Sequence, residues 1–265
     1  MKYDSLESNG SFFMPVGNTL SLFNGISALH LALDKAGIKH GQVYYAEIDK
    51  YANKVTEKHY PNDIALGDVT KWREWDIDWA SIDLVGAGFP CQAWSVAGKQ
   101  LGDKDERGML FWTTLEIIAH VLKHNPKAKF LMENVKMKKD FEQYITYHTE
   151  QALGKVEKIL INSALVSAQN RNRYYWTNFE VTQPDDRGIL LKNILESEPD
   201  EKYTVSQDAL PRYTDKNGKV KGFRDSMQKG NCLTASMHKG FGNDGCTVVY
   251  GGAIVTGKQI GRAHV

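Results

Sequence analysis

Two residues of this chain, a cysteine and a glutamate, each follow an apolar stretch and could act together on one substrate. Cys91 lies behind a proline in "GAGFPCQAWS", just past a predicted strand, and Glu133 lies in "FLMENV" at the end of another. A thiolate is a strong nucleophile, and a carboxyl group beside it can serve as a general acid. The structural alternatives are a small buried thiol for Cys91 and a salt bridge or helix cap for Glu133.

A second group of polar residues stands at alternate positions in "AQNRNRYYW". Gln169, Arg171 and Arg173 would share one face of an extended segment, because side chains on a strand alternate between its two faces. Both guanidinium groups could then point into one site. A pair of solvated arginines is the structural alternative at this spacing.

Three turns upstream of the cysteine suit a cofactor that contains adenosine. Gly25 in "SLFNGIS" lets a ligand approach the backbone, and Glu47 in "AEID" follows about twenty residues later, where a carboxylate can accept from ribose hydroxyls. Asp68 in "GDVT" could accept from the exocyclic amine of adenine. No complete GxGxxG motif is present. This favours S-adenosylmethionine over NAD, because S-adenosylmethionine has no pyrophosphate to bind.

The elements that must position these residues alternate between strand and helix. Apolar stretches predict strands within 18–23, 42–49, 64–70, 82–88, 127–134, 155–162 and 173–179, and periodic ones predict helices within 28–36, 50–60, 109–125 and 141–153. Gly37 stands where a helix C-cap belongs, and the helix before Pro61 has to end ahead of it. The alternation predicts an α/β fold with a mostly parallel, doubly wound sheet, whose ligands bind at the carboxyl ends of the strands.

Composition and charge narrow the class of protein. The chain has 265 residues, 42% hydrophobic and 25% charged, which suits one large domain or one domain with a small second lobe. We expect no signal peptide and no membrane span. Three cysteines without a CxxC pair predict a reducing cytoplasm, no disulfide framework and no metal. Residues 202–240 carry eight Lys or Arg against three Asp, a net +5 in a chain of net +1, which fits either a polyanion-binding lobe or a solvated one.

Read in order, the motifs resemble those of the DNA cytosine-C5 methyltransferase family over roughly residues 19 to 180. The matching pieces are "SLFNGIS" for the cofactor turn, "AEID" for the ribose acid, "GDVT" for the adenine contact, "GFPCQAWS" for the nucleophile loop, "MENV" for the acid motif and "QNRNRYYW" for Gln-x-Arg-x-Arg. The stretch "SLFNGISALHLAL" is similar to the branch that contains the animal de novo enzymes and small phage enzymes. Asn24 stands where the family more often has Asp.

The resemblance implies a Rossmann-like fold of the S-adenosylmethionine-dependent methyltransferases with a small target-recognition lobe. It implies methyl transfer from S-adenosylmethionine to C5 of cytosine in double-stranded DNA, through a covalent bond from the thiol to C6 and with the base flipped out of the duplex. The catalytic residues that it implies are Cys91, Glu133, Arg171 and Arg173. The cofactor contacts are Phe23, Asn24, Gly25, Ile26, Glu47, Ile48, Asp68, Val69 and Pro90. The substrate contacts are Ser95, Asn134, Gln169, Arg171 and Arg173.

The expected organisation is an N-terminal extension (1–18), a catalytic domain (19–180), a recognition region with the later motifs (181–250), and a tail (251–265) that is truncated or non-native. The loop between Cys91 and the next helix has Gly98, Gly102 and Gly108 as pivots, and we expect it to close over the flipped base. A hairpin is expected in "TDKNGKVKG", and "NCLTAS" resembles the later motifs.

Three other functions stay open from the sequence: the same reaction on a tRNA cytosine, a catalytically inactive scaffold that binds DNA, and an NAD-dependent dehydrogenase. The recognition sequence, a restriction enzyme as partner, a phage origin and the oligomeric state are also open.

Overall fold

The structure, a computed structural model, describes residues 15–90 and 106–195 and short segments at 223–224, 228–230, 247–249 and 254–255. Cys91, Ser95, Gly98 and Gly102 lie outside the described residues, as do the predicted hairpin and "NCLTAS". The chain divides into two compact units. One comprises Met1–Leu160 with Tyr174–Val181, and the other comprises Ile161–Arg173 with Thr182–Val265.

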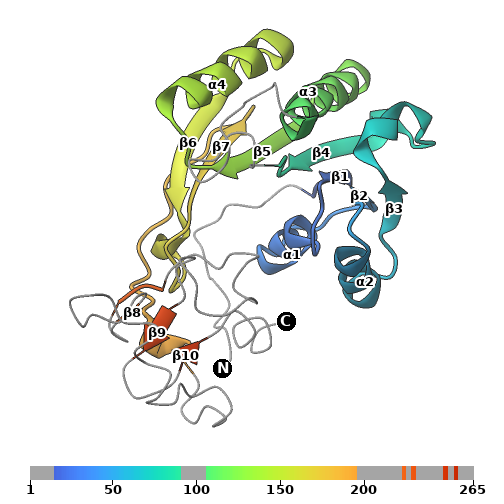
Figure 1. Cartoon of the computed structure of the whole chain (residues 1–265). Coiled ribbons are helices and arrows are strands. Elements are labelled where there is room, and N and C mark those ends of the chain that lie inside the picture. Colours follow the sequence, from blue (N-terminus) through green and yellow to red (C-terminus); the bar gives the residue numbers. More distant parts are fainter. Residues whose placement is uncertain are drawn as a thin grey trace. The chain divides into compact units, whose positions relative to one another are not determined.

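A seven-stranded sheet in the order β3-β2-β1-β4-β5-β7-β6 forms the framework (Figure 1). Its strands are β1 (Asn18–Leu22), β2 (Val43–Ala46), β3 (Ile64–Gly67), β4 (Ile82–Ala87), β5 (Lys129–Val135), β6 (Glu157–Asn162) and β7 (Asn172–Thr177). β1 pairs in parallel with β2 and β4, β2 with β3, and β4 with β5. The strand order therefore reverses between β1 and β4, as the prediction of a mostly parallel, doubly wound sheet requires. A separate three-stranded sheet consists of β8 (Phe223–Arg224), β9 (Thr247–Val249) and β10 (Ile254–Val255).

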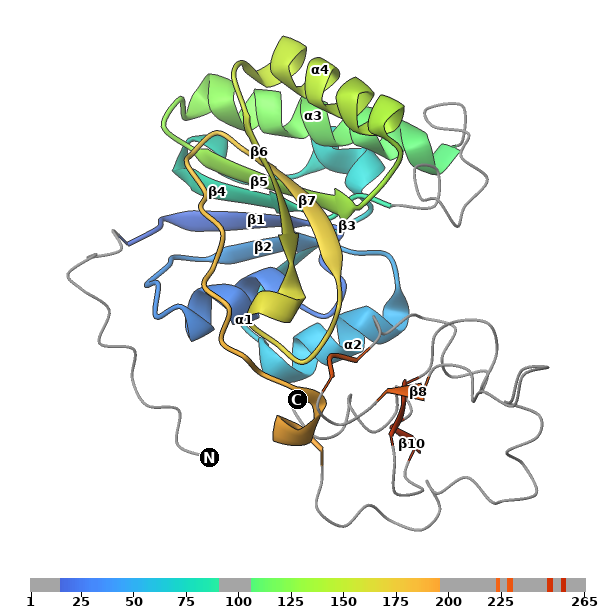
Figure 2. The same ribbon diagram turned by 90° about the vertical axis from the view of Figure 1, so that its left-hand side faces the viewer.

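In the described part of the chain, four α-helices cover the two faces of the large sheet. They are α1 (Ala28–Lys35), α2 (Lys50–His59), α3 (Glu106–His124) and α4 (Lys139–Leu153). α1 and α2 lie on one face, and α3 and α4 lie together on the other (Figures 1 and 2). Short 3-10 helices occur at η1 (Val69–Glu74), η2 (Trp79–Ser81), η4 (Ser163–Leu165) and η5 (Leu191–Asn193).

Capping residues that can be recognised in the sequence set the ends of α1 and α2. The Asp49 carboxylate caps α2 by accepting from the backbone N–H groups of Tyr51 and Ala52, and these bonds hold the pKa of that carboxyl below its usual range. α1 ends in a Schellman turn: Gly37 has a φ of 66°, and the N–H of Ile38 reaches back to the carbonyl of Leu33 at 3.0 Å. Gly37 ends α1 as predicted, at the position directly after the C-cap residue Ala36, and α2 ends before Pro61 as expected.

The core of the first unit lies between the sheet and its helices. The largest fully buried side chains there are Leu20, Leu22, Ile82, Phe111, Ile117, Ile118, Phe130, Met132, Ile145 and Trp176. Trp176 of β7 also donates from its indole nitrogen to Thr146 of α4 at 2.8 Å, which ties that strand to the helix. No helix in the described part of the chain is both long enough and apolar enough to cross a bilayer.

One expectation about the loop after Cys91 is wrong. Gly108 was expected as a flexible pivot, but it lies inside the first turn of α3, which begins at Glu106, and is buried. α3 extends three residues upstream of Met109, over a charged pair and a glycine that carry no apolar helical pattern of their own.

Candidate active site

The carboxyl ends of five strands line up because the sheet register places one residue from each in a single rung. The rung consists of Leu22, Ala46, Gly67, Ala87 and Met132. The residues that directly follow it are Phe23, Glu47, Asp68, Gly88 and Glu133. Glu47 and Asp68 directly follow β2 and β3, whereas Glu133 lies within the last three residues of β5, which continues to Val135. The three acidic residues predicted from sequence therefore lie toward the same edge of the sheet. Open α/β sheets bind ligands at this edge, beside the point where strand order reverses.

The end of β5 lies against the segment that leads from β4 into Cys91. A Cβ added at Gly88 would lie 3.5 Å from Oε2 of Glu133, so the carboxylate stands beside the backbone three residues ahead of the thiol. The next residue, Asn134, is 1% exposed and donates from Nδ2 to the carbonyl of Phe89 at 3.1 Å. Phe89 is itself buried against Phe111. These contacts fix the direction in which the chain leaves β4, and Pro90 is the last described residue before Cys91.

The turn after β1 has an unusual backbone. Phe23 and Ser27 have φ values of 56° and 68°, and Gly25 between them has 57°. Left-handed conformations outside glycine cost about 1–3 kcal/mol each and cluster at functional sites. A Cβ placed on Gly25 would meet no atom within 4 Å, so the turn presents open backbone at the edge of the sheet.

A buried network of polar side chains holds this strained turn. Asn24 accepts from Ser21 Oγ at 2.8 Å and donates from Nδ2 to Ser27 Oγ at 3.0 Å and to Thr56 Oγ1 at 3.2 Å. Thr56 belongs to α2, and its hydroxyl also lies 2.8 Å from that of Ser27. All four side chains are buried. The amide of Asn24 supplies both a donor and an acceptor here, which a carboxylate could not do.

The network gives a prediction for Thr56→Val, which keeps the side-chain shape and removes the hydroxyl. We expect the free energy of unfolding to fall by about 1–3 kcal/mol, because Asn24 and Ser27 each lose a buried partner. Urea denaturation measures the loss, and Thr56→Ser, which keeps the hydroxyl, is the control. A loss for Thr56→Ser as large as that for Thr56→Val would show that packing matters and the hydrogen bonds do not.

Glu47, which directly follows β2, also holds the turn after β1. Glu47 Oε2 accepts from the N–H of Gly25 at 2.8 Å, and its Oε1 accepts from the N–H groups of Ile48 and Asp49. Two apolar residues next in sequence to the bonded groups are exposed: Ile48, which follows Glu47, is 78% exposed, and Ile26, which follows Gly25, is 56% exposed. A fixed carboxylate and exposed apolar side chains in adjoining turns fit a ligand with ribose hydroxyls and an apolar ring.

The acid after β3 shares this edge. Asp68 uses its Oδ1 to accept from the N–H and hydroxyl of Thr70, which caps η1 and fixes the side chain. Val69, the next residue, is buried and anchors η1 to the core. The residues present therefore fit an adenosine cofactor: open backbone at Gly25, an oriented acid at Glu47 and a second acid at Asp68.

The Gln-x-Arg-x-Arg motif belongs to the second unit. Gln169 forms a parallel bridge with Gly230, Arg171 lies directly ahead of β7, and Arg173 is the second residue of that strand. The N–H of Arg171 donates to Asn162 Oδ1 at 2.9 Å, and Arg173 Nη1 donates to the carbonyl of Asn172 at 2.9 Å. All three motif side chains are half-buried.

Lys229, which belongs to no motif in the sequence, holds together several turns of the second unit. Its Nζ donates to the carbonyls of Ala164 at 2.6 Å and Ser167 at 3.2 Å, and also to that of Ile189. The adjacent Gly230 bonds to both sides of Gln169 through its own N–H and carbonyl. A lone lysine in a polar, turn-rich segment carries no sequence signal for such a role, because its partners are backbone carbonyls more than 35 residues away.

Lys229→Met is therefore expected to loosen the second unit. Three carbonyls would lose a charged donor, and we expect a loss of about 2–4 kcal/mol in the free energy of unfolding. Limited proteolysis should show faster cleavage between 163 and 190. The exposed Lys192→Met is the matched control, and equal protection of both variants would contradict the role of Lys229.

Residues 17–242 match the family described as C-5 cytosine-specific DNA methylase. The Type II methyltransferase M1.ScrFI of Lactococcus lactis subsp. cremoris is 34% identical over 248 residues, which is 83% of this chain and 61% of the relative. M.NlaX of Neisseria lactamica is 35% identical over 73% of this chain and 64% of its own length. The chain thus spans less than two thirds of the length of these relatives.

Solved structures share the fold. A methyltransferase of Entamoeba histolytica superposes with a TM-score of 0.66 at 16% identity, covering 91% of this chain and 78% of the other. A mutant DNMT2 of Spodoptera frugiperda gives a TM-score of 0.57 at 23% identity, with coverages of 83% and 70%. These likenesses confirm the fold expected from the sequence.

Proposed function

The chain belongs to the C-5 cytosine-specific DNA methylase family, and on that premise we propose that it transfers a methyl group to C5 of cytosine in double-stranded DNA. One observation supports this most strongly. Glu133 and the segment entering Cys91 lie side by side at the sheet edge that also bears the strained turn and Glu47. The names of the relatives support the same proposal, because M1.ScrFI and M.NlaX are both Type II methyltransferases.

The cofactor of this family is S-adenosylmethionine, whose sulfonium supplies an electrophilic methyl group. Here Gly25 would offer its open backbone to the cofactor, Glu47 would accept from the ribose hydroxyls, and Asp68 would accept from the adenine amine. The bound cofactor would cover the exposed side chains of Ile26 and Ile48. Phe23, Asn24, Val69 and Pro90 remain predicted contacts that shape this edge.

The reaction needs a nucleophile because C5 of cytosine is unreactive on its own. The Cys91 thiolate attacks C6, and the new S–C6 bond gives C5 the character of an enamine. Glu133 donates a proton or hydrogen bond to N3, which offsets the negative charge that would otherwise develop on the ring. C5 would then take the methyl group from the bound cofactor, which would leave as the neutral thioether. A base would then remove the C5 proton, the Cys91 thiolate would leave as the C5–C6 double bond re-forms, and N3 would return its proton to Glu133.

The remaining predicted residues bind the substrate. By the resemblance, Arg173 holds O2 of the cytosine, and Arg171 steadies the loop or a phosphate. Gln169, Asn134 and Ser95 line the base and its backbone. Asn134 also has the positioning role that the structure describes, since it bonds the carbonyl of Phe89.

The target ring is inaccessible inside a duplex, so the nucleotide has to flip out at a cost of a few kcal/mol. Phosphate contacts from the net +5 segment at 202–240 would offset that cost. DNA affinity should therefore fall steeply with salt.

Bisulfite sequencing of a plasmid from cells that express the chain tests the function. We expect protected cytosines in one fixed sequence context, and none in a plasmid from cells that express Cys91→Ser. A matching restriction enzyme should fail to cut the protected sites, in keeping with a role in restriction-modification. Labelled-cofactor assays on DNA and tRNA in parallel distinguish the nucleic acids, and incorporation into tRNA alone would contradict the proposal.

A further inference from the structure

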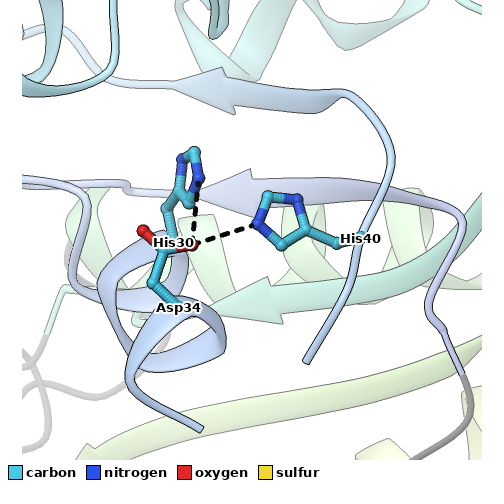
Figure 3. A group of neighbouring side chains, drawn as sticks. All are labelled: His30, Asp34 and His40. Carbon is cyan, nitrogen blue, oxygen red and sulfur yellow. Dashed lines mark hydrogen bonds and ion pairs between the residues drawn. The ribbon is translucent and has the colours of Figure 1, made fainter. Parts of the chain in front are cut away.

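A cluster of two histidines and an aspartate lies outside the candidate active site, where the end of α1 meets the segment that enters β2. His30 and Asp34 are four residues apart on α1 and therefore share one face of the helix. The Schellman turn at Gly37 reverses the chain and brings His40 back toward them. Figure 3 shows the three side chains pointing toward one another. One potential ligand atom from each lies within 4.8 Å of the other two.

Hydrogen bonds fix which nitrogen of each ring faces the cluster. His30 Nδ1 lies 2.8 Å from Oδ2 of Asp63, a buried carboxylate, and His40 Nδ1 lies 2.9 Å from the carbonyl of Gly41. Both partners are acceptors, so each Nδ1 carries a hydrogen and each neutral ring has its lone pair on Nε2. Backing of a histidine by a carboxylate or a carbonyl is the usual outer shell of a metal-bound imidazole.

The two Nε2 atoms converge on a third atom that also bears lone pairs. Oδ1 of Asp34 lies 3.5 Å from His40 Nε2 and 3.9 Å from His30 Nε2. When His40 is protonated, its Nε2 donates to Asp34 Oδ1 across the 3.5 Å contact. When both rings are neutral, the two Nε2 atoms and Oδ1 are all acceptors, and a cation bound between them takes the place of that proton. Ligand atoms about 2.0–2.2 Å from a tetrahedral metal are about 3.4 Å apart, which is close to the two observed separations.

The surroundings suit a divalent cation. Asp34 and Asp63 bring two carboxylates to the cluster, and the ring of Tyr60 stacks on His30 at 3.8 Å and holds it in place. The side chain of Asp34 is 47% exposed, so solvent can reach the site and water can fill a fourth position. Two imidazoles and one carboxylate favour zinc and similar transition metals over Mg²⁺ and Ca²⁺, which prefer all-oxygen sites.

We propose that His30, Asp34 and His40 bind a zinc-type divalent metal ion that ties the end of α1 to the segment entering β2. The expectation of no metal rested on cysteine spacing, which does not bear on a site of this composition. None of the three residues belongs to the candidate cofactor or catalytic set. The expected effect of the metal is therefore on stability. The metal proposal can be tested independently of the proposed methyl transfer.

Calorimetric titration of chelator-treated protein with Zn²⁺, in a Cys91→Ser background that removes the proposed nucleophile as a competing ligand, tests the site. We expect one strong site and a rise in Tm of about 5 °C when free Zn²⁺ is a hundredfold above its Kd. Asp34→Asn, a change at a half-exposed position, should abolish both effects, and so should His40→Ala. Co²⁺ substitution adds a spectroscopic readout, because tetrahedral Co²⁺ absorbs strongly in the visible.

The matched control is His59→Ala, which removes an exposed histidine of α2 and should leave the Zn²⁺ titration unchanged. Equal Zn²⁺ binding by Asp34→Asn and the parent would overturn the proposal. So would a parent whose Tm depends on pH across the histidine range but not on Zn²⁺, because protons and no metal would then occupy the cluster.

Discussion

Cys91→Ser is expected to abolish methyl transfer to DNA and to leave S-adenosylmethionine binding nearly intact. An unperturbed thiol titrates near pH 8.5 and so supplies some thiolate at neutral pH, whereas a serine hydroxyl supplies almost no alkoxide. Without the bond to C6, C5 does not become nucleophilic. Incorporation of labelled methyl groups measures the rate, and calorimetry measures cofactor affinity.

The other two cysteines provide the comparison for that experiment. Cys232→Ser and Cys246→Ser should keep methyl transfer near the wild-type rate, because the proposed mechanism gives them no role. Turnover by Cys91→Ser near the wild-type rate would contradict a covalent route.

Glu133→Gln is expected to lower the methyl-transfer rate by roughly 10³–10⁴-fold, at the upper end of what a positioned general acid contributes. Glutamine has the same shape and leaves the approach to Gly88 unchanged, but it cannot give a proton to N3. Single-turnover kinetics with saturating DNA and cofactor isolates the chemical step from binding and product release.

Glu150→Gln, an exposed change on α4, is the matched control and should have the wild-type rate. A rate for Glu133→Gln within about tenfold of the wild type would mean that this carboxyl has no proton-transfer role.

Much of the fold follows from local signals in the sequence. Gly37 and Pro61 mark the ends of α1 and α2, and the alternation of strands and helices gives the parallel sheet. The common edge reached by Glu47, Asp68 and Glu133 also follows, since parallel strands end on the same side.

Other features depend on contacts between distant parts of the chain. The pairing of Asn24 with Thr56 spans 32 residues, and no local pattern predicts it. The start of α3 was misplaced because a glycine reads as a loop residue, whereas Gly108 is buried in the helix. The orientation of the His30 and His40 rings depends on which acceptors back them, which only coordinates reveal.

The proposed bond between Cys91 and C6 of cytosine can be tested directly by trapping. A duplex with 5-fluorocytosine at the target position keeps fluorine where the C5 proton would be removed, so the thiolate cannot leave after methyl transfer. We expect mass spectrometry of protein incubated with this duplex and S-adenosylmethionine to show a protein–DNA adduct, located on the peptide that contains Cys91. Methylation of ordinary duplex by the same preparation with no such adduct, or with an adduct on another residue, would contradict the account.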